Sequence, residues 1–296
     1  MADLELVISG RQLATVAPTP ASTALARRLI VNADDFGGSA SINEAVIRAH
    51  EDGILTSASL MLNEPGFAEA VKLARENPTL GVGLHLTLLH GHSALSAKEI
   101  PDLVDEEGKF SFNPVAVGMR YFANRGLKAQ LLAEIEAQFA KFRETGLPLD
   151  HVNGHLHLHL HPTVFQLLAA NVSRWRITHL RLTHDPFWLN ARLTGGYWIY
   201  RVSHAMIHRV LCDRSRRVLR RLNIKHTSAV FGLLQNARVD EGYIMRLLPK
   251  LPPGDSELYS HPSLDQFKHE FEALISPKVK ALVDRLGIRL IRYLDL

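Results

Sequence analysis

Short apolar runs alternate with amphipathic stretches along most of the chain, and this alternation restricts the fold more than any other feature. The apolar runs are typical of buried strands and cover residues 29–33, 57–62, 82–88, 151–158, 179–183, 229–233, 256–259 and 288–293. The stretches between them show helical spacing, most clearly at residues 42–52, 67–76, 127–144, 163–172, 240–248 and 264–274. Repeated strand–helix units require parallel strands joined by right-handed crossovers. Because no glycine fingerprint for a dinucleotide follows the first run, we expect an irregular TIM-like (β/α) barrel rather than an open doubly wound sheet.

The length and the charge of the chain limit its organisation and its partners. A chain of 296 residues with 46% hydrophobic residues can bury one large core, so residues 27–296 are expected to form a single domain. Residues 1–26 lack periodicity and predict a flexible N-terminal extension, while residues 186–225 predict an inserted helical segment. A formal net charge of +4 does not indicate nucleic acid as a partner. One cysteine, no leader pattern and no spanning segment predict a cytoplasmic protein.

Two adjacent carboxylates, Asp34 and Asp35, follow the first predicted strand and precede a glycine pair. Neighbouring side chains on a strand face opposite ways, but near a strand end both can turn into one cleft. One interpretation is a metal ligand beside a general base, since two carboxylates in different environments suit these two roles. The other is a turn or a helix N-cap, and this stretch alone favours neither.

Other polar residues lie at or near the ends of later predicted strands, where barrel enzymes place their chemistry. They are Asn63, His85, His155, Arg181, Glu257 and His261. The run His151–Pro162 alternates histidine with other residues, so a continuing strand would place His155, His157, His159 and His161 on one face. For any one of the last three, hydrogen bonding is expected rather than ligation. The cluster as a whole predicts a metal site, because one Asp and two His leave positions open for water and substrate.

The chain resembles the YdjC-like carbohydrate deacetylases from residue 27 onward, through four motifs in the same order. These motifs are Val31–Gly37, Gly83–His85, His151–Pro162 and Glu257–Pro262. Three further segments are similar to the branch of that family encoded with hopanoid biosynthesis, namely residues 100–105, 146–153 and 251–254. That second resemblance implies an N-acetylglucosaminyl hopanoid as the substrate.

The resemblance also implies a role for each site residue. Asp35, His85 and His155 would bind one divalent metal ion, with zinc or magnesium first and manganese, iron or cobalt also accepted. Asp34 would be the base that activates water, and His261 would donate a proton to the leaving amine. Asn63, His157, His159, Arg181 and Glu257 are lesser candidates for binding or orienting the substrate or the base. This chain has Asn153-Gly154 where many relatives have Asp-Ser, which removes a carboxylate from behind the metal ligands.

These observations favour metal-dependent N-deacetylation of an N-acetylglucosaminyl glycolipid. A metal-dependent phosphoesterase is the alternative enzyme, although a two-metal site there would use more carboxylates. A His-rich metal-binding protein without catalysis is the other alternative. It is disfavoured because the expected ligands are spread over several strand ends.

Residues 186–225 also predict where a lipid substrate is met. Four apolar residues lie at helical spacing, and seven arginines surround them; these are Ile199, Val202, Met206 and Val210, with Arg201, Arg209, Arg214, Arg216, Arg217, Arg220 and Arg221. Such a helix suits peripheral contact with anionic lipid, here the inner membrane. The alternative is that the apolar residues pack on the barrel and the arginines are solvated. A lipid substrate favours contact with the membrane instead, because its apolar body stays in the bilayer while the sugar enters the cleft. The sequence is also compatible with a homodimer.

Overall fold

The computed structural model describes residues 26–235 and 237–296, so the expected extension over residues 1–26 lies outside the described residues except for Ala26. The strands are β1 (Arg27–Phe36), β2 (Ser57–Leu60), β3 (Gly81–Leu86), β4 (Val152–Gly154), β5 (Ala229–Phe231), β6 (Gly254–Ser260) and β7 (Arg289–Leu290). The helices are α1 (Ala40–Glu51), α2 (Phe67–Glu76), α3 (Pro114–Ala123), α4 (Leu127–Glu144), α5 (Pro162–Ala170), α6 (Val172–Trp175), α7 (Phe187–Leu193), α8 (Trp198–Arg221), α9 (Glu241–Leu247), α10 (Lys268–Leu274) and α11 (Pro277–Arg285). Short 3-10 turns cover His155–Leu160 (η1), Leu233–Gln235 (η2), Leu248–Lys250 (η3) and Tyr293–Asp295 (η4).

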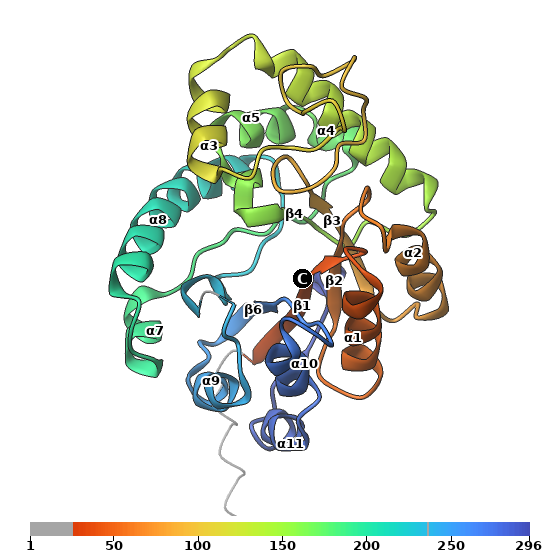
Figure 1. Ribbon diagram of the computed structural model, residues 1–296. Coiled ribbons are helices and arrows are strands. Elements are labelled where there is room, and N and C mark those ends of the chain that lie inside the picture. Colours follow the sequence, from red (N-terminus) through yellow and green to blue (C-terminus); the bar gives the residue numbers. More distant parts are fainter. Residues whose placement is uncertain (1–25, 236) are drawn as a thin grey trace, which may run out of the picture.

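The strands form one parallel sheet in the order β4-β3-β2-β1-β6-β5, and helices surround it (Figure 1). The short β7 pairs only with Arg28 and Leu29 at the start of β1. This confirms the expected α/β barrel of irregular form. Its strands are buried on both faces, as continuous apolar runs predict.

Residues 179–183 were expected to form a regular strand, and that expectation is wrong. They form isolated bridges instead, one of which joins Leu180 to Val152 of β4. Four residues after Leu180, the carbonyl oxygen of His184 accepts a hydrogen bond of 3.0 Å from the amide of Val230 in β5. The extended segment 179–184 therefore connects the two outer strands β4 and β5 through single contacts, and it completes the ring.

The helices follow their sequence signals closely. The predicted stretches 67–76 and 127–144 coincide with α2 and α4, and the inserted segment contains α7 and α8. Local capping sets several helix starts. At α1, for example, the Ser39 hydroxyl accepts a hydrogen bond from the backbone amide of Ile42. Within the described residues, no helix is both long enough and apolar enough to cross a bilayer.

The predicted strand over residues 151–158 stops at Gly154, so the shared histidine face is a wrong prediction. Leu156 and His157 have φ angles of 48° and 59°, and η1 occupies the rest of the run. Two successive residues in the left-handed region end the period-two alternation of a strand. The histidines of the run consequently point to different parts of the molecule.

Candidate active site

The two adjacent carboxylates reach the same cleft because β1 is irregular where they lie. The register between β1 and β2 shifts between Ala33 and Phe36, and Asp35 has a φ of 63°. A bulge of this kind re-aims side chains that a regular strand would send to opposite faces. Non-glycine residues with a left-handed backbone, such as Asp35, are often found at functional sites.

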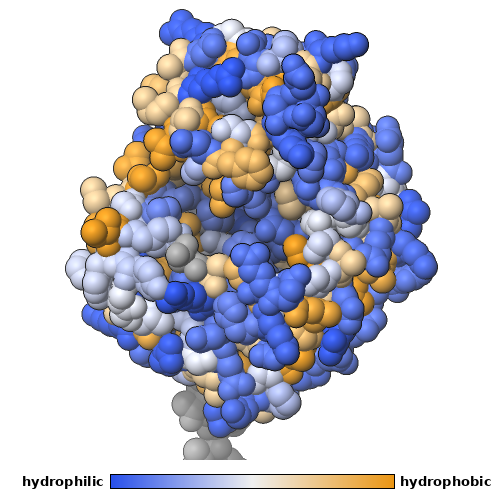
Figure 2. Space-filling view, viewed as in Figure 1, coloured by the Kyte–Doolittle hydropathy of each residue, from blue (hydrophilic) through white to orange (hydrophobic). Residues whose placement is uncertain are grey.

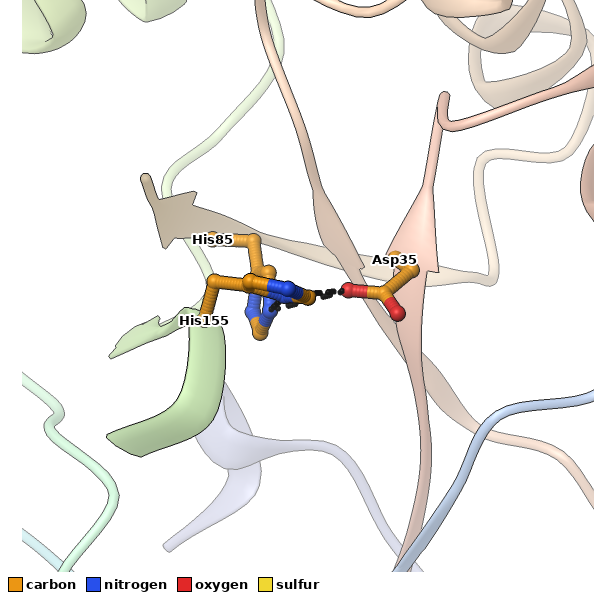
Figure 3. A group of neighbouring side chains, drawn as sticks. All are labelled: Asp35, His85 and His155. Atoms are coloured by element: carbon orange, nitrogen blue, oxygen red, sulfur yellow. Dashed lines mark hydrogen bonds and ion pairs between the residues drawn. The ribbon is translucent and has the colours of Figure 1, made fainter. Parts of the chain in front are cut away.

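Asp35, His85 and His155 bring three metal-binding atoms together at the ends of β1, β3 and β4 (Figure 3). Asp35 Oδ1 lies 3.2 Å from His85 Nε2 and 2.9 Å from His155 Nδ1, and the two imidazole nitrogens are 3.3 Å apart. Ligands about 2.1 Å from one ion at tetrahedral or octahedral angles would be separated by about 3.0–3.4 Å. The donor set therefore fits one divalent cation and leaves one side of it open.

Asn153 fixes the orientation of one of these imidazoles. Its side-chain oxygen accepts the Nδ1–H of His85 at 2.7 Å, which leaves Nε2 unprotonated and facing the other two donors. The Asn153 amide nitrogen donates to Ser59 at 2.7 Å and to Asp34 at 3.2 Å. An amide thus occupies the place behind His85 where many relatives are expected to have a carboxylate.

The charges of the triad are coupled to one another. Burial opposes ionisation of Asp35, but the neighbouring His155 and His85 lower its pKa well below the usual range. Burial likewise opposes a charge on His155, while Asp35 raises the pKa of that imidazole. A proton and a metal ion would therefore compete for the same atoms, so metal binding would release protons.

Asp34 lies beside the triad and is held by a buried arginine. Arg181 Nη1 and Nη2 donate to the two carboxylate oxygens of Asp34 at 2.7 and 2.9 Å, and both side chains are almost fully buried. Burial alone would raise the pKa of Asp34, but the Arg181 charge holds it well below its ordinary value. Glu257 accepts two further bonds from the same guanidinium and one from Tyr293. Asp34 is thereby fixed as an oriented anion.

His261 lies near the two aspartates and has a carboxylate of its own behind it. Its Nδ1 is 3.7 Å from Glu270 Oε2, an ion-pair distance rather than a hydrogen bond, and its amide donates to the same oxygen at 2.5 Å. Burial lowers the pKa of His261, but Glu270, Asp35 and Asp34 raise it to about 9. The imidazole would therefore carry a proton at neutral pH.

The remaining sequence candidates have other contacts. Asn63 bonds the carbonyl of His92 and the ammonium of Lys141, so its amide is used in holding surface segments together. His159 donates from Nε2 to the carbonyl of Arg181, and burial lowers its pKa to about 3. His157 bonds the Tyr259 hydroxyl at 2.9 Å, and burial lowers the pKa of this imidazole well below its ordinary value. None of these three side chains joins the triad.

Comparison with known proteins identifies the group to which this arrangement belongs. A family model described as "YdjC-like protein" matches residues 28–285. The chain belongs to the YdjC-like protein family. The chain also shares its fold with a crystal structure from Enterococcus faecalis V583, which is provisionally named a cellobiose-phosphate cleavage protein. Its TM-score is 0.70 at 24% identity, over 91% of this chain and 98% of that one.

Two curated relatives of this YdjC-like chain are named carbohydrate deacetylases. The protein of Brevibacillus brevis is 39% identical over 150 residues, which are 51% of this chain and 57% of the relative. That of Geobacillus stearothermophilus is 38% identical over 152 residues, or 51% of this chain and 58% of the relative. The aligned part thus covers a little over half the length of each relative.

The structure adds site residues of the YdjC-like chain that sequence reasoning missed. Tyr259 lies with its ring 4.5 Å from the Arg181 guanidinium carbon, and Glu270 lies behind His261. His90 is exposed, and the centroid of its ring lies 6.2 Å from that of His155 in a stacked arrangement. Glu270 carried one signal, because it is an acid within an otherwise apolar helical face. Figure 2 shows a hollow in the middle of this side of the molecule, with hydrophilic residues inside it.

Proposed function

We propose that this protein hydrolyses the acetamide of an N-acetylated amino sugar and uses one divalent metal ion. The observation that carries the proposal is the convergence of Asp35, His85 and His155, with an oriented carboxylate, Asp34, beside them. The carbohydrate deacetylases among its relatives support the same reaction class. Residues 27–296 would act as one catalytic unit.

Each site residue has a specific task in this reaction. The metal, zinc or magnesium in first place, would polarise the acetyl carbonyl and make water more acidic. Asp34 would accept the proton of the attacking water, in the orientation that Arg181 imposes. Its low pKa makes it a weak base, so it depends on water that is already acidified.

Collapse of the tetrahedral intermediate requires a proton on the amide nitrogen, because an amide anion is a very poor leaving group. His261 is the proposed donor. Glu270 and the two aspartates keep this imidazole protonated. Acetate and a free amino sugar would be the products.

We further propose that the sugar is part of a glycolipid, such as an N-acetylglucosaminyl hopanoid. Support comes from α8, where Ile199, Met206 and Val210 are 89%, 65% and 70% exposed. Figure 2 shows apolar residues on the side of the molecule where α3 and α8 lie. Between α7 and α8 there is also a cavity of about 640 Å³, with apolar residues such as Phe187, Trp188 and Met206 in its wall. Exposed apolar area of this kind is typical of lipid or partner contacts.

The phosphoesterase alternative is less well supported by the same geometry. A second metal ion would need further carboxylates, whereas both oxygens of Asp34 are already bonded to Arg181. An assay decides between the reactions: acetate release from N-acetylglucosaminyl compounds is compared with phosphate release from a panel of phosphoesters, with and without chelator. Acetate release that stops with chelator supports the proposal. Phosphate release alone would replace it, and no release of either would favour a metal-binding protein.

A further inference from the structure

Arg201 departs from the pattern of the arginines around it. On α8 the neighbouring Arg209, Arg214 and Arg217 are exposed, whereas Arg201 is only 1% exposed. Its Nη1 donates to the Thr194 carbonyl at 2.5 Å, but Nε and Nη2 have no hydrogen-bond partner among the described residues. A buried guanidinium with two unpaired N–H groups is costly, because desolvation is not offset by a bonded anion.

This side chain lines a small cavity with a strong excess of positive charge. The cavity has a volume of about 170 Å³ and lies where the α7–α8 connection meets η2 and α9. Arg238 and Arg246 line it together with Arg201, and Asp240 is the acid in its wall. The volume is sufficient for a small oxyanion, and the wall carries three cations against one carboxylate.

The backbone on one side of the cavity also favours an anion. Gly195 and Gly196 precede α8, and a Cβ on either would meet no atom within 4 Å. Gly196 and Tyr197 have φ angles of 83° and 52°, and the 24-residue helix that follows has no side-chain cap at its start. Successive left-handed residues before an uncapped helix expose N–H groups and the positive end of the helix dipole.

Within the described residues, the nearby carboxylates form no ion pair with these arginines. The Asp240 carboxylate instead accepts a hydrogen bond of 2.7 Å from the amide of Tyr243 and caps α9. Asp185 is the acid whose charge acts on Arg201, but its oxygens are bonded to Asn190 and to the amide of Leu234. Burial also raises the pKa of Asp185 to about 7, which reduces its negative charge at neutral pH.

We propose that this cavity is a binding site for a phosphate-class oxyanion, held by Arg201, Arg238 and the N–H groups at the start of α8. Inorganic phosphate, a phosphorylated sugar and an anionic lipid headgroup share this chemistry. Charge-assisted bonds from two guanidinium groups would offset the burial of Arg201. The site lies outside the triad and is independent of the proposed deacetylation.

The test is a calorimetric titration of inorganic phosphate into the full chain at constant ionic strength. We expect saturable binding by the parent and an affinity about tenfold lower in Arg238→Gln, a loss of about 1.4 kcal/mol. Arg125→Gln is the control, because it removes one exposed charge that lies outside the cavity and outside α8. Deacetylation of a neutral N-acetyl sugar should be equal in all three proteins, so failure of the site is distinguishable from failure of the proposed function.

A second variant tests the buried guanidinium itself. Arg201→Met should abolish phosphate binding without lowering the melting temperature in phosphate-free buffer, since it removes an unpaired buried charge. Glucosamine 6-phosphate and phosphatidylglycerol vesicles, used as competitors, identify the source of the anion. A metal centre can also attract phosphate, so equal phosphate affinity in Arg238→Gln and Arg125→Gln would overturn the proposal. Absence of saturable phosphate binding by the parent would overturn it as well.

Discussion

Arg181 bonds both carboxylate oxygens of Asp34, through Nη1 to Oδ2 at 2.7 Å and through Nη2 to Oδ1 at 2.9 Å. Both groups are withdrawn from solvent, and Glu257 binds the other edge of the guanidinium. The proposed base is therefore part of a buried network that fixes its direction and keeps it ionised.

Replacing Arg181 with Met should cost about 3–5 kcal/mol of unfolding free energy, because Asp34 and Glu257 lose the charge between them. In protein that still folds, the pKa of Asp34 should rise and move the acid limb of the pH–rate profile upward. Arg28→Met is the matched control, since Arg28 pairs with Asp255 in similar geometry but is partly exposed. That pair should be worth about 1 kcal/mol or less. If urea titration shows equal losses of unfolding free energy in Arg181→Met and Arg28→Met, burial does not make the Arg181 network more stabilising than a partly exposed pair.

Asn153 should control the affinity of the site for metal without being a ligand. Removing its bond to His85 in Asn153→Ala should weaken metal binding by about 10–100-fold. Asn153→Asp keeps an acceptor for His85 but places a carboxylate against Asp34, so metal should stay bound while kcat falls. Competition with a fluorescent chelator measures the affinity. Unchanged affinity in the Ala variant would mean that His85 is oriented by other contacts.

His261 should make the metal-free protein less stable as pH rises. Its pKa is raised from 6.5 to about 9 in the folded state, mainly by Glu270 against the effect of burial. The folded state therefore holds the proton more tightly, so the stabilisation is complete below pH 6.5 and is lost as pH rises through 9. The loss should reach up to about 3 kcal/mol. Urea unfolding measured between pH 6.5 and 9 should show that the unfolding free energy of His261→Gln falls less steeply with pH than that of the parent. An equally steep fall in both proteins would exclude the raised pKa.

For catalysis, His261→Ala should slow turnover while metal content stays normal. The same variant should be affected least on an ester substrate, whose leaving oxygen needs no full protonation. Poor metal binding by this variant would instead make His261 a ligand or a structural residue.

The exposed face of α8 should bind anionic vesicles, and this binding should weaken with salt. Replacing Arg216, Arg217, Arg220 and Arg221 with Gln should abolish activity on membrane-embedded substrate but not on a short soluble analogue. Arg201 is excluded from this set because it is buried. Equal loss on both substrates would indicate a folding or catalytic defect, and absence of vesicle binding by the parent would show that α8 does not dock on membranes.

Much of the architecture was predictable because local patterns determine it. The uninterrupted helical spacing of residues 67–76 gives α2 its bounds, and the apolar run before Asp34 gives β1. The convergence of Asp35, His85 and His155 follows from parallel strands whose carboxyl ends meet at one edge of the barrel.

The remainder depends on tertiary contacts that no local pattern contains. The left-handed turn at Leu156 and His157 separates histidines that a strand would have aligned. The burial of Arg201 contradicts the ordinary preference of arginine for the surface, and it results from packing against the α7–α8 connection. Glu270 meets His261 from another element, at a distance that sequence spacing does not encode.

Metal content and acetate release, measured together in Asp34→Asn and His155→Ala, test the division of roles at the site most directly. We expect Asp34→Asn to bind one equivalent of metal and to release almost no acetate from an N-acetylglucosaminyl substrate. We expect His155→Ala to lose both the metal and the activity. Substantial acetate release by Asp34→Asn, or full metal occupancy in His155→Ala, would contradict the proposed division between base and metal ligand.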